Sequence, residues 1–438
     1  MPAKIIVDNS AKDTKINGRT LWKQFSQWEH LPLLILVICT LILHFSFIMR
    51  PDTTVGDETY YVNNSRFIID DKSDFIPEHP SLGKLIIIGG IEIFGDNPLG
   101  WRFFSVLFGT VAIILFYFIC RKLKMSHLAT IIATILFALD DMFFVHSSLG
   151  WLDIYMLTFM LAGFLLYLHE AYIPMGIIFA LSALCKFSGG LGILAIGIHW
   201  LLTRRNKKKQ MLISVIVTGA SFLLFMTLCQ YAVSGMWVNP IQRTMVILRL
   251  TASKTYSVYN AVNPDDYMYD TIYDIQEIDS TAVRPWGWLL PHKIFSYSET
   301  SIQYLSFISW TIQIFIIPAV IYMFYKTSRG NNAACFSVTW FTATYLTWIP
   351  LVLITDRITY DFYFLPTIGA VCMGIGIALS DIINKLKNRV NQQGERNTKV
   401  KIAYTGVILY LLLHLAIFII SNPALPDQFK QWLKPIIH

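Results

Sequence analysis

Charged residues are scarce in this chain of 438 residues: Asp, Glu, Lys and Arg make up 14% of it, while hydrophobic residues make up 55%. A composition this apolar is atypical of soluble proteins. Cysteine is also sparse, and the six cysteines include no C-x-x-C pair, so the sequence indicates neither a disulfide framework nor a zinc site. The net charge of +7 comes from basic residues in short gaps between apolar blocks, which indicates a membrane and argues against a nucleic-acid partner.

Internal repeats are missing, and most apolar blocks carry no charge at mid-depth. Many transporters are built on inverted halves, and ion pathways usually need charged residues inside the membrane. The sequence therefore disfavours a membrane transporter, which remains the alternative from another class of protein.

The apolar blocks predict an all-α polytopic membrane protein with about eleven transmembrane helices. The expected spans are residues 31–49, 101–120, 128–146, 151–169, 172–186, 187–203, 211–233, 304–325, 334–354, 360–381 and 402–421. The fifth and sixth spans are either two short helices or one long tilted helix. The glycine pair at 189–190 favours a break. We expect no cleavable signal peptide, because the first apolar block starts late and has full span length.

Basic residues in alternate loops predict the orientation of the chain, because cytoplasmic loops are rich in Lys and Arg. Residues 1–30 are expected to form a cytoplasmic segment, residues 31–421 the transmembrane catalytic domain, and residues 422–438 a tail on the far side. The two large loops, residues 50–100 and 234–303, are expected outside the cytoplasm. Loop 50–100 is the candidate catalytic loop.

Loop 50–100 contains an adjacent carboxylate pair, Asp57 and Glu58, followed by His79 and Lys84. A carboxylate near the membrane surface can be desolvated, which raises its pKa and makes it suitable for acid or base chemistry. We predict that Asp57 is the reactive group. Glu58 points elsewhere in any regular backbone, so it is expected to orient the loop or the acceptor. The alternative for both is a solvated surface position.

Three cations reach the same membrane face in this topology: Arg102, Lys186 and Arg357. Guanidinium and ammonium groups suit the oxygens of a phosphate headgroup, and His79 is a further candidate donor. Snorkelling to the interface is the alternative for each cation.

Three further acids, Asp140, Asp141 and Asp153, flank the short loop between the third and fourth spans on that same face. They could support the site or, together with Asp57, hold a divalent cation. Helix capping and pairing with Arg102 are the structural alternatives. No metal ligand and no cofactor are assigned, and dependence on a divalent metal is left open.

The polar motifs, taken in order, resemble those of the protein O-mannosyltransferase family, membrane glycosyltransferases of the GT-C fold. They are Asp57-Glu58; His79-Pro80-Ser81-Leu82-Gly83-Lys84; Asn97-Pro98-Leu99-Gly100-Trp101-Arg102; Leu139-Asp140-Asp141-Met142-Phe143-Phe144-Val145-His146-Ser147 with Leu152-Asp153; Ala183-Leu184-Cys185-Lys186-Phe187-Ser188-Gly189; and Arg357-Ile358-Thr359-Tyr360-Asp361-Phe362-Tyr363-Phe364-Leu365-Pro366. Ser81 and Phe187 depart from the family pattern. Residues 234–303 are too few to hold the lumenal sugar-binding-like (MIR) module of eukaryotic members, so the chain resembles a prokaryotic member.

The resemblance implies an inverting transfer of mannose from a polyprenyl- or dolichyl-phosphate donor to Ser or Thr hydroxyls of exported polypeptides. Asp57 is then the general base, and Arg102, Lys186, Arg357 and His79 bind the donor phosphate. The alternative is another GT-C enzyme that moves a different lipid-linked sugar to a lipid or glycan.

The expected partners are the lipid-linked donor, a polypeptide acceptor and membrane lipid, with a dimer left open. The expected location is a prokaryotic cell membrane, or the endoplasmic reticulum membrane if the source is eukaryotic. The active site is expected on the extracytoplasmic face.

Overall fold

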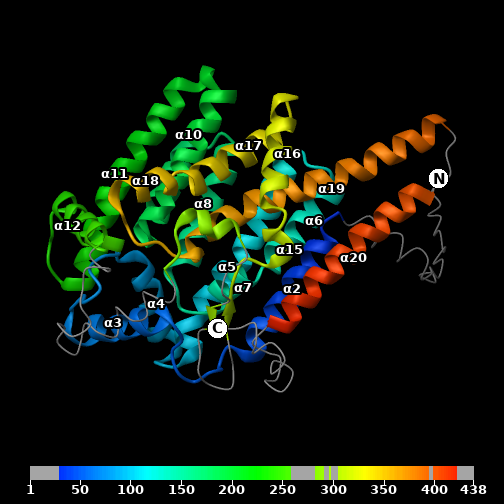
Figure 1. Ribbon diagram of the computed structural model, residues 1–438. Helices are drawn as coiled ribbons and strands as arrows, with labels where there is room; N and C mark the ends of the chain where they lie inside the picture. Colours follow the sequence, from blue (N-terminus) through cyan, green and yellow to red (C-terminus); the bar gives the residue numbers. More distant parts are fainter. Residues whose placement is uncertain (1–28, 258–281, 291–294, 297–303, 394–397, 422–438) are drawn as a thin grey trace, which may run out of the picture.

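The computed structural model describes residues 29–257, 282–290, 295–296, 304–393 and 398–421, and these residues are mostly helical (Figure 1). The α-helices are α2 (Leu31–Phe47), α3 (Asp57–Asp71), α4 (Leu82–Phe94), α5 (Pro98–Lys122), α6 (His127–Ala138), α7 (Asp141–Ser148), α8 (Leu152–Leu168), α9 (Tyr172–Cys185), α10 (Leu191–Thr203), α11 (Lys208–Ser234), α12 (Pro240–Ser253), α15 (Trp310–Gln313), α16 (Ile316–Ser328), α17 (Asn332–Phe341), α18 (Trp348–Thr355), α19 (Leu365–Gln393) and α20 (Thr398–Ser421). Shorter helical turns are η1 (Phe187–Gly190), η2 (Arg205–Lys207), η4 (Pro285–Leu289), η5 (Thr342–Leu346) and η6 (Asp361–Phe364). Strands β1 (Phe295–Ser296) and β2 (Leu305–Ser306) pair antiparallel.

Within these described ranges, five helices are long and apolar enough to cross a membrane, and the bent pair α6–α7 would make a sixth. Helices α2, α8, α9 and the unit η1–α10 are apolar but shorter. A polytopic all-α membrane protein is therefore confirmed. The count of eleven spans is not confirmed and stays a prediction.

The expected span over residues 304–325 is wrong over residues 304–309, where the chain forms β2 and a loop before α15 and α16. The loop is drawn to the start of α7 by hydrogen bonds. The amide of Ser309 donates to the carboxylate of Asp140 at 2.9 Å, and its hydroxyl donates to Asp141 at 2.7 Å. Ser309 is thereby held just outside α15, which begins at the next residue.

The chain does break between the fifth and sixth expected spans, as the glycine pair predicts. Helix α9 ends at Cys185, and Lys186 has an extended backbone with φ −156° and ψ 135°. The turn η1 and helix α10 follow at once. The break places the Lys186 side chain at an interruption between two helices, where it is not confined to a helix face.

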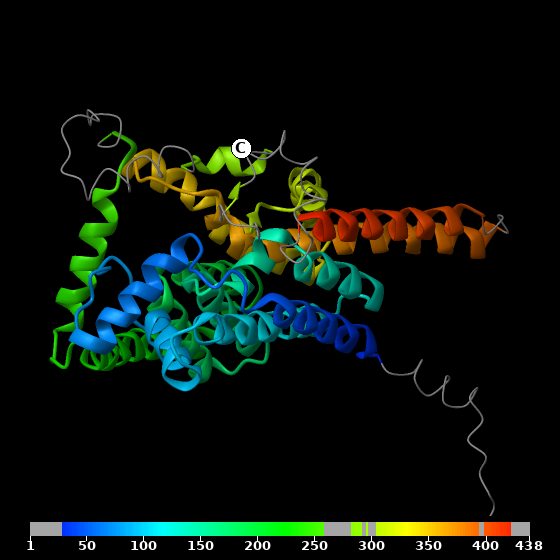
Figure 2. The ribbon, with the colours of Figure 1, turned by 90° about the horizontal axis from the view of Figure 1, so that it is seen from below.

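Helix α8 lies in the core and packs against α5 and α9, whereas α11 and α20 present mostly exposed apolar faces, as lipid-facing helices do. Helices α19 and α20 run side by side and extend away from the rest of the bundle in both views (Figures 1 and 2). Helices α3 and α4 (blue) and α12 (green) lie beside one another at one end of the bundle (Figure 1). The candidate site is built at that end.

Candidate active site

The carboxylate pair opens helix α3, with Asp57 as its first residue. Gly56 precedes it with φ +54°, a left-handed conformation that glycine adopts without strain. The positive end of a helix dipole favours an ionised carboxylate. Asp57 is half-buried at this end of the helix.

Glu58 is fully buried and joins three parts of the chain. Its carboxylate accepts hydrogen bonds from the side chain of Arg102 at 3.0 and 2.8 Å and from the amides of Val55 at 3.1 Å and Gly150 at 2.9 Å. A side chain at position 150 would crowd this carboxylate, because a Cβ there would lie 3.4 Å from Glu58 Oε1. Glu58 thus holds the loop that contains Asp57, and its orienting role in the reaction stays a prediction.

Arg102 is also fully buried, and its hydrogen bonds use all five guanidinium N–H groups. Besides the two bonds to Glu58, it donates to the carbonyl oxygens of Ile48 at 3.0 Å, Pro51 at 2.9 Å and Thr53 at 3.0 Å. A guanidinium with every donor engaged has none left for a phosphate. The geometry assigns Arg102 to the scaffold of the first loop, and not to the donor site predicted for it.

Lys186 forms a buried ion pair with Asp153, and Nζ lies 2.9 Å from both carboxylate oxygens. The ammonium also lies 5.1 Å from the ring centre of Phe362 and 5.3 Å from that of Tyr363. These contacts bring α8, the break after α9 and the turn η6 to one place. Asp153, predicted as a supporting residue, is the direct partner of the predicted phosphate ligand Lys186.

Arg357 comes from an extended segment held on both sides by backbone hydrogen bonds. The amide of Ile358 donates to the carbonyl of Lys254 at 3.0 Å, and the amide of Val283 donates to that of Thr359 at 2.8 Å. This pairing fixes the direction of the Arg357 side chain without a regular sheet. Two parts of loop 234–303 and the segment just before the tenth expected span therefore meet here.

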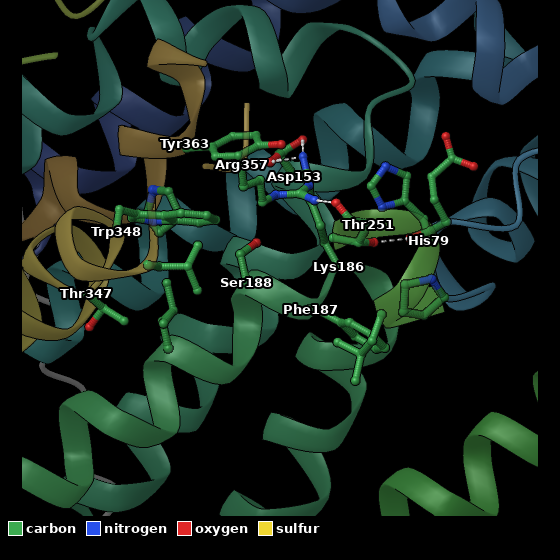
Figure 3. A pocket seen from close by; sticks show the side chains of 16 residues that line it. His79, Asp153, Lys186, Phe187, Ser188, Thr251, Thr347, Trp348, Arg357 and Tyr363 are labelled. Atoms are coloured by element: carbon green, nitrogen blue, oxygen red, sulfur yellow. Dashed lines mark hydrogen bonds and ion pairs between the residues drawn. The ribbon is translucent and has the colours of Figure 1, made fainter. Parts of the chain in front are cut away.

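A cavity of about 230 Å³ opens between these elements, and its lining is largely apolar (Figure 3). Four predicted residues line it: His79, Asp153, Lys186 and Arg357. The guanidinium of Arg357 donates to the carbonyl oxygen of Thr251 and makes no other hydrogen bond within the described ranges. A guanidinium has five donors, so Arg357 retains capacity for a phosphate.

His79 lies edge-on to the ring of Tyr61, with ring centres 6.0 Å apart. Burial lowers the pKa of His79 well below its usual value, and the positive charges of Lys186 and Lys84 act in the same direction. The imidazole is therefore neutral at pH 7, with one N–H donor and one acceptor nitrogen. It can donate a hydrogen bond without adding charge to the site.

Asp57 does not line this cavity, but its negative charge acts on residues at or near the cavity. Burial, followed by the negative charge of Asp57, raises the pKa of Tyr61 well above its usual value. The same carboxylate acts electrostatically on the ammonium of Lys186. The predicted base therefore lies within electrostatic reach of the predicted phosphate ligand Lys186.

Lys84 does not line the cavity but is bound to the loop between α3 and α4. Its ammonium lies 2.6 Å from the carboxylate of Asp74 and 2.6 Å from the carbonyl oxygen of Ile76. Burial lowers the pKa of Lys84, and the charge of Asp74 opposes this shift. Asp74 also pairs with Arg243 of α12 at 3.2 Å. This cluster ties α12 to the loop between α3 and α4.

Asp140 and Asp141 have structural partners. Asp140 caps α7 by accepting from the amide of Phe143 at 3.0 Å, and Asp141 accepts from the hydroxyls of Ser309 and Ser421. The capping alternative is therefore the one observed for Asp140. Across the residues that the structure describes, no three His, Cys, Asp or Glu side chains are grouped as metal ligands.

Several cavity residues were not predicted from the sequence, among them Glu78, Thr251, Trp348 and Tyr363. Glu78 precedes His79, and Tyr363 lies in the aromatic run after Arg357, so both were adjacent to a recognised signal. Thr251 and Trp348 lie in stretches without a distinguishing pattern. Only the fold brings them to the cavity.

Comparison with known proteins gives a match between residues 78–231 and the family model of dolichyl-phosphate-mannose-protein mannosyltransferases. The polyprenol-phosphate-mannose–protein mannosyltransferase of Mycobacterium tuberculosis is 32% identical over 136 residues, which are 30% of this chain and 26% of that protein. The corresponding protein of Corynebacterium glutamicum is 40% identical over 85 residues, 19% of this chain and 16% of its own length. The matched stretches span only these minor parts of the relatives.

Two solved structures share the fold over nearly the whole chain. The Pmt1–Pmt2 protein O-mannosyltransferase complex of S. cerevisiae, bound to the sugar donor, has a TM-score of 0.62 at 12% identity, covering 92% of this chain and 91% of that chain. The oligosaccharyltransferase of Archaeoglobus fulgidus has a TM-score of 0.55 at 14% identity, covering 94% of this chain and 58% of that chain.

The fold is therefore that of the GT-C membrane glycosyltransferases, as predicted. The family match over residues 78–231 and the curated relatives agree, over these parts of the chain, with the resemblance of its motifs to the protein O-mannosyltransferase family.

Proposed function

We propose that this chain is an inverting mannosyltransferase that moves mannose from a polyprenyl-phosphate donor to Ser or Thr hydroxyls of exported polypeptides. The observation that carries the proposal is the cavity in which Lys186 and Arg357 meet a largely apolar lining that includes Leu248, Trp348 and Leu351. Fixed cations suit a phosphate, and apolar walls suit the adjoining lipid chain. The names of the curated relatives specify a polyprenol-phosphate-mannose donor and a protein acceptor, which supports the same substrates here.

The mechanism is a single displacement. Asp57 takes the proton of the acceptor hydroxyl as its oxygen attacks the anomeric carbon of mannose. The bond between that carbon and the phosphate oxygen breaks, and the electron pair leaves with the lipid phosphate. Lys186 and Arg357 stabilise the additional negative charge on the leaving phosphate. His79, neutral and at the cavity wall, donates a hydrogen bond to the phosphate or to the acceptor.

A transfer assay tests the proposal directly. Purified protein in lipid is incubated with polyprenyl-phosphate [¹⁴C]mannose and a Ser/Thr-rich peptide, with a Ser/Thr-to-Ala peptide as the control. We expect label only in the hydroxyl-bearing peptide. Transfer to a lipid or glycan in place of the peptide would show that the acceptor is not a polypeptide. No transfer to any acceptor would contradict the proposed function.

We further propose that the site faces the extracytoplasmic side of a cell membrane, and single cysteines test this orientation. Cys39 is exposed, so it is first replaced by Ala. Cysteine is then placed at Ser73, which is exposed between α3 and α4, or at Lys208, which is exposed at the start of α11. In intact cells, an impermeant thiol reagent should label position 73 and spare position 208 until the membrane is opened. The reverse pattern would show that the orientation is wrong.

A further inference from the structure

His146 is a buried residue beside the site that the mechanism above does not use. It lies in the last turn of α7 and is 0% exposed. Neither of its ring nitrogens has a hydrogen-bond partner in the described part of the chain. A neutral imidazole has one donor and one acceptor, and burying both without partners costs stability. A buried polar group kept at such a cost points to a role other than packing.

The ring of His146 contacts the part of the structure that presents the base. It lies edge-on to the indole of Trp151, with ring centres 4.5 Å apart. That indole donates to the carbonyl oxygen of Val55 at 3.3 Å, two residues before Asp57. A shift of His146 would therefore displace Trp151 and, through it, the first loop.

The same ring also contacts the part that binds phosphate. Its centre lies 5.9 Å from that of Phe362, whose ring in turn faces the ammonium of Lys186 at 5.1 Å. The charges of Asp153 and Lys186 both act on His146, with opposite signs. The imidazole is thus within electrostatic reach of the ion pair that borders the cavity.

We propose that His146 is a positioning residue for the donor-phosphate site, an inference that rests on the proposed function. The ammonium of Lys186 directs its hydrogen bonds to both oxygens of Asp153, and an arriving phosphate competes with that carboxylate for the same charge. The imidazole of His146 supplies the hydrogen-bonding group that steadies Asp153 while Lys186 turns to the phosphate. His146 acts through Asp153 and Lys186 and does not contact the donor.

Two substitutions of equal shape and different polarity separate this role from packing. Met and Gln have similar length, but only the Gln amide can donate and accept hydrogen bonds. We expect His146→Met to fold, to bind polyprenyl-phosphate mannose roughly ten-fold more weakly and to turn over more slowly, because the phosphate no longer competes successfully with Asp153 for Lys186. His146→Gln should retain most of the donor affinity of the wild type.

His414 of α20 provides the matched control. It is buried, its Nε2 also has no partner in the described ranges, and its Nδ1 lies 2.6 Å from the hydroxyl of Thr311, away from the cavity. His414→Met should lower the melting temperature and leave the donor affinity per folded molecule unchanged.

Equal donor affinity and kcat in wild type and His146→Met would overturn the inference, and so would equal losses in the Met and Gln variants, which would indicate shape alone. If either variant fails to fold, His146→Leu and His146→Asn make the same comparison. A wild-type protein that does not bind the donor would instead contradict the proposed function, so the two failures are distinguishable.

Discussion

Asp57→Asn should lower turnover by roughly 10²–10⁴-fold while the donor still binds, because the amide keeps the shape of the carboxylate but cannot accept the proton. The structure supports this expectation. Asp57 opens α3 in the loop held by Glu58, and its charge reaches both Tyr61 and Lys186. The measurement is single-turnover transfer to a Ser/Thr peptide at saturating donor, with donor affinity determined separately.

The adjacent acid provides the contrast. Glu58→Gln leaves Arg102 buried without its charged partner, and breaking a buried ion pair from one side costs about 3–5 kcal/mol of stability. We therefore expect Glu58→Gln to lower the melting temperature strongly and to turn over faster than Asp57→Asn per folded molecule. Near-normal turnover in a folded Asp57→Asn protein would show that Asp57 is not the general base and would contradict the mechanism.

Arg357→Ala should weaken donor binding by roughly ten- to a hundred-fold, since a hydrogen bond to a charged group contributes about 1.5–3 kcal/mol. The residue lines the cavity, and within the described ranges its guanidinium is held by one hydrogen bond, to Thr251. Arg357→Lys keeps the charge but loses the planar pair of donors, so its affinity should fall between those of the wild type and the Ala variant. Equilibrium binding of labelled polyprenyl-phosphate mannose measures all three.

Arg284 is the control for this substitution. It pairs with Asp356, the residue before Arg357, at 3.4 Å, and it is more than a third exposed outside the cavity. Arg284→Ala removes an arginine from the same neighbourhood and should leave the donor affinity within about two-fold, as an exposed pair of this kind contributes little. Unchanged affinity in a folded Arg357→Ala protein would remove Arg357 from the donor site.

The membrane fold was predictable because apolar runs and their basic flanks are properties of consecutive residues. The break at Lys186 followed from the glycine pair beside it. The irregular start of residues 304–325 did not follow, since its cause is the contact of Ser309 with Asp140 and Asp141, which are distant in sequence. Helices α3 and α4 were likewise hidden inside what hydropathy showed only as a polar loop.

Most residues of the candidate site were predictable from the sequence, but the ion pairs that they form with one another were not. The motifs identified Arg102, Lys186 and Arg357 together, because all three are cations expected on one face of the membrane. The structure places them differently. Arg102 donates its hydrogen bonds to Glu58 and to backbone carbonyl oxygens, while Lys186 and Arg357 line the cavity. Which of the three cations is fully hydrogen-bonded within the protein depends on contacts between residues distant in sequence, and the sequence alone does not show these contacts.

The anomeric configuration of the product tests the central claim most directly. The transfer assay is run with a β-linked polyprenyl-phosphate mannose, and the one-bond carbon–proton coupling at the anomeric centre of the glycopeptide is measured by NMR. A single displacement by an acceptor hydroxyl, with Asp57 as base and Lys186 and Arg357 on the leaving phosphate, predicts an α-linked mannoside. A β-linked product would require two displacements through a covalent intermediate and would contradict the account.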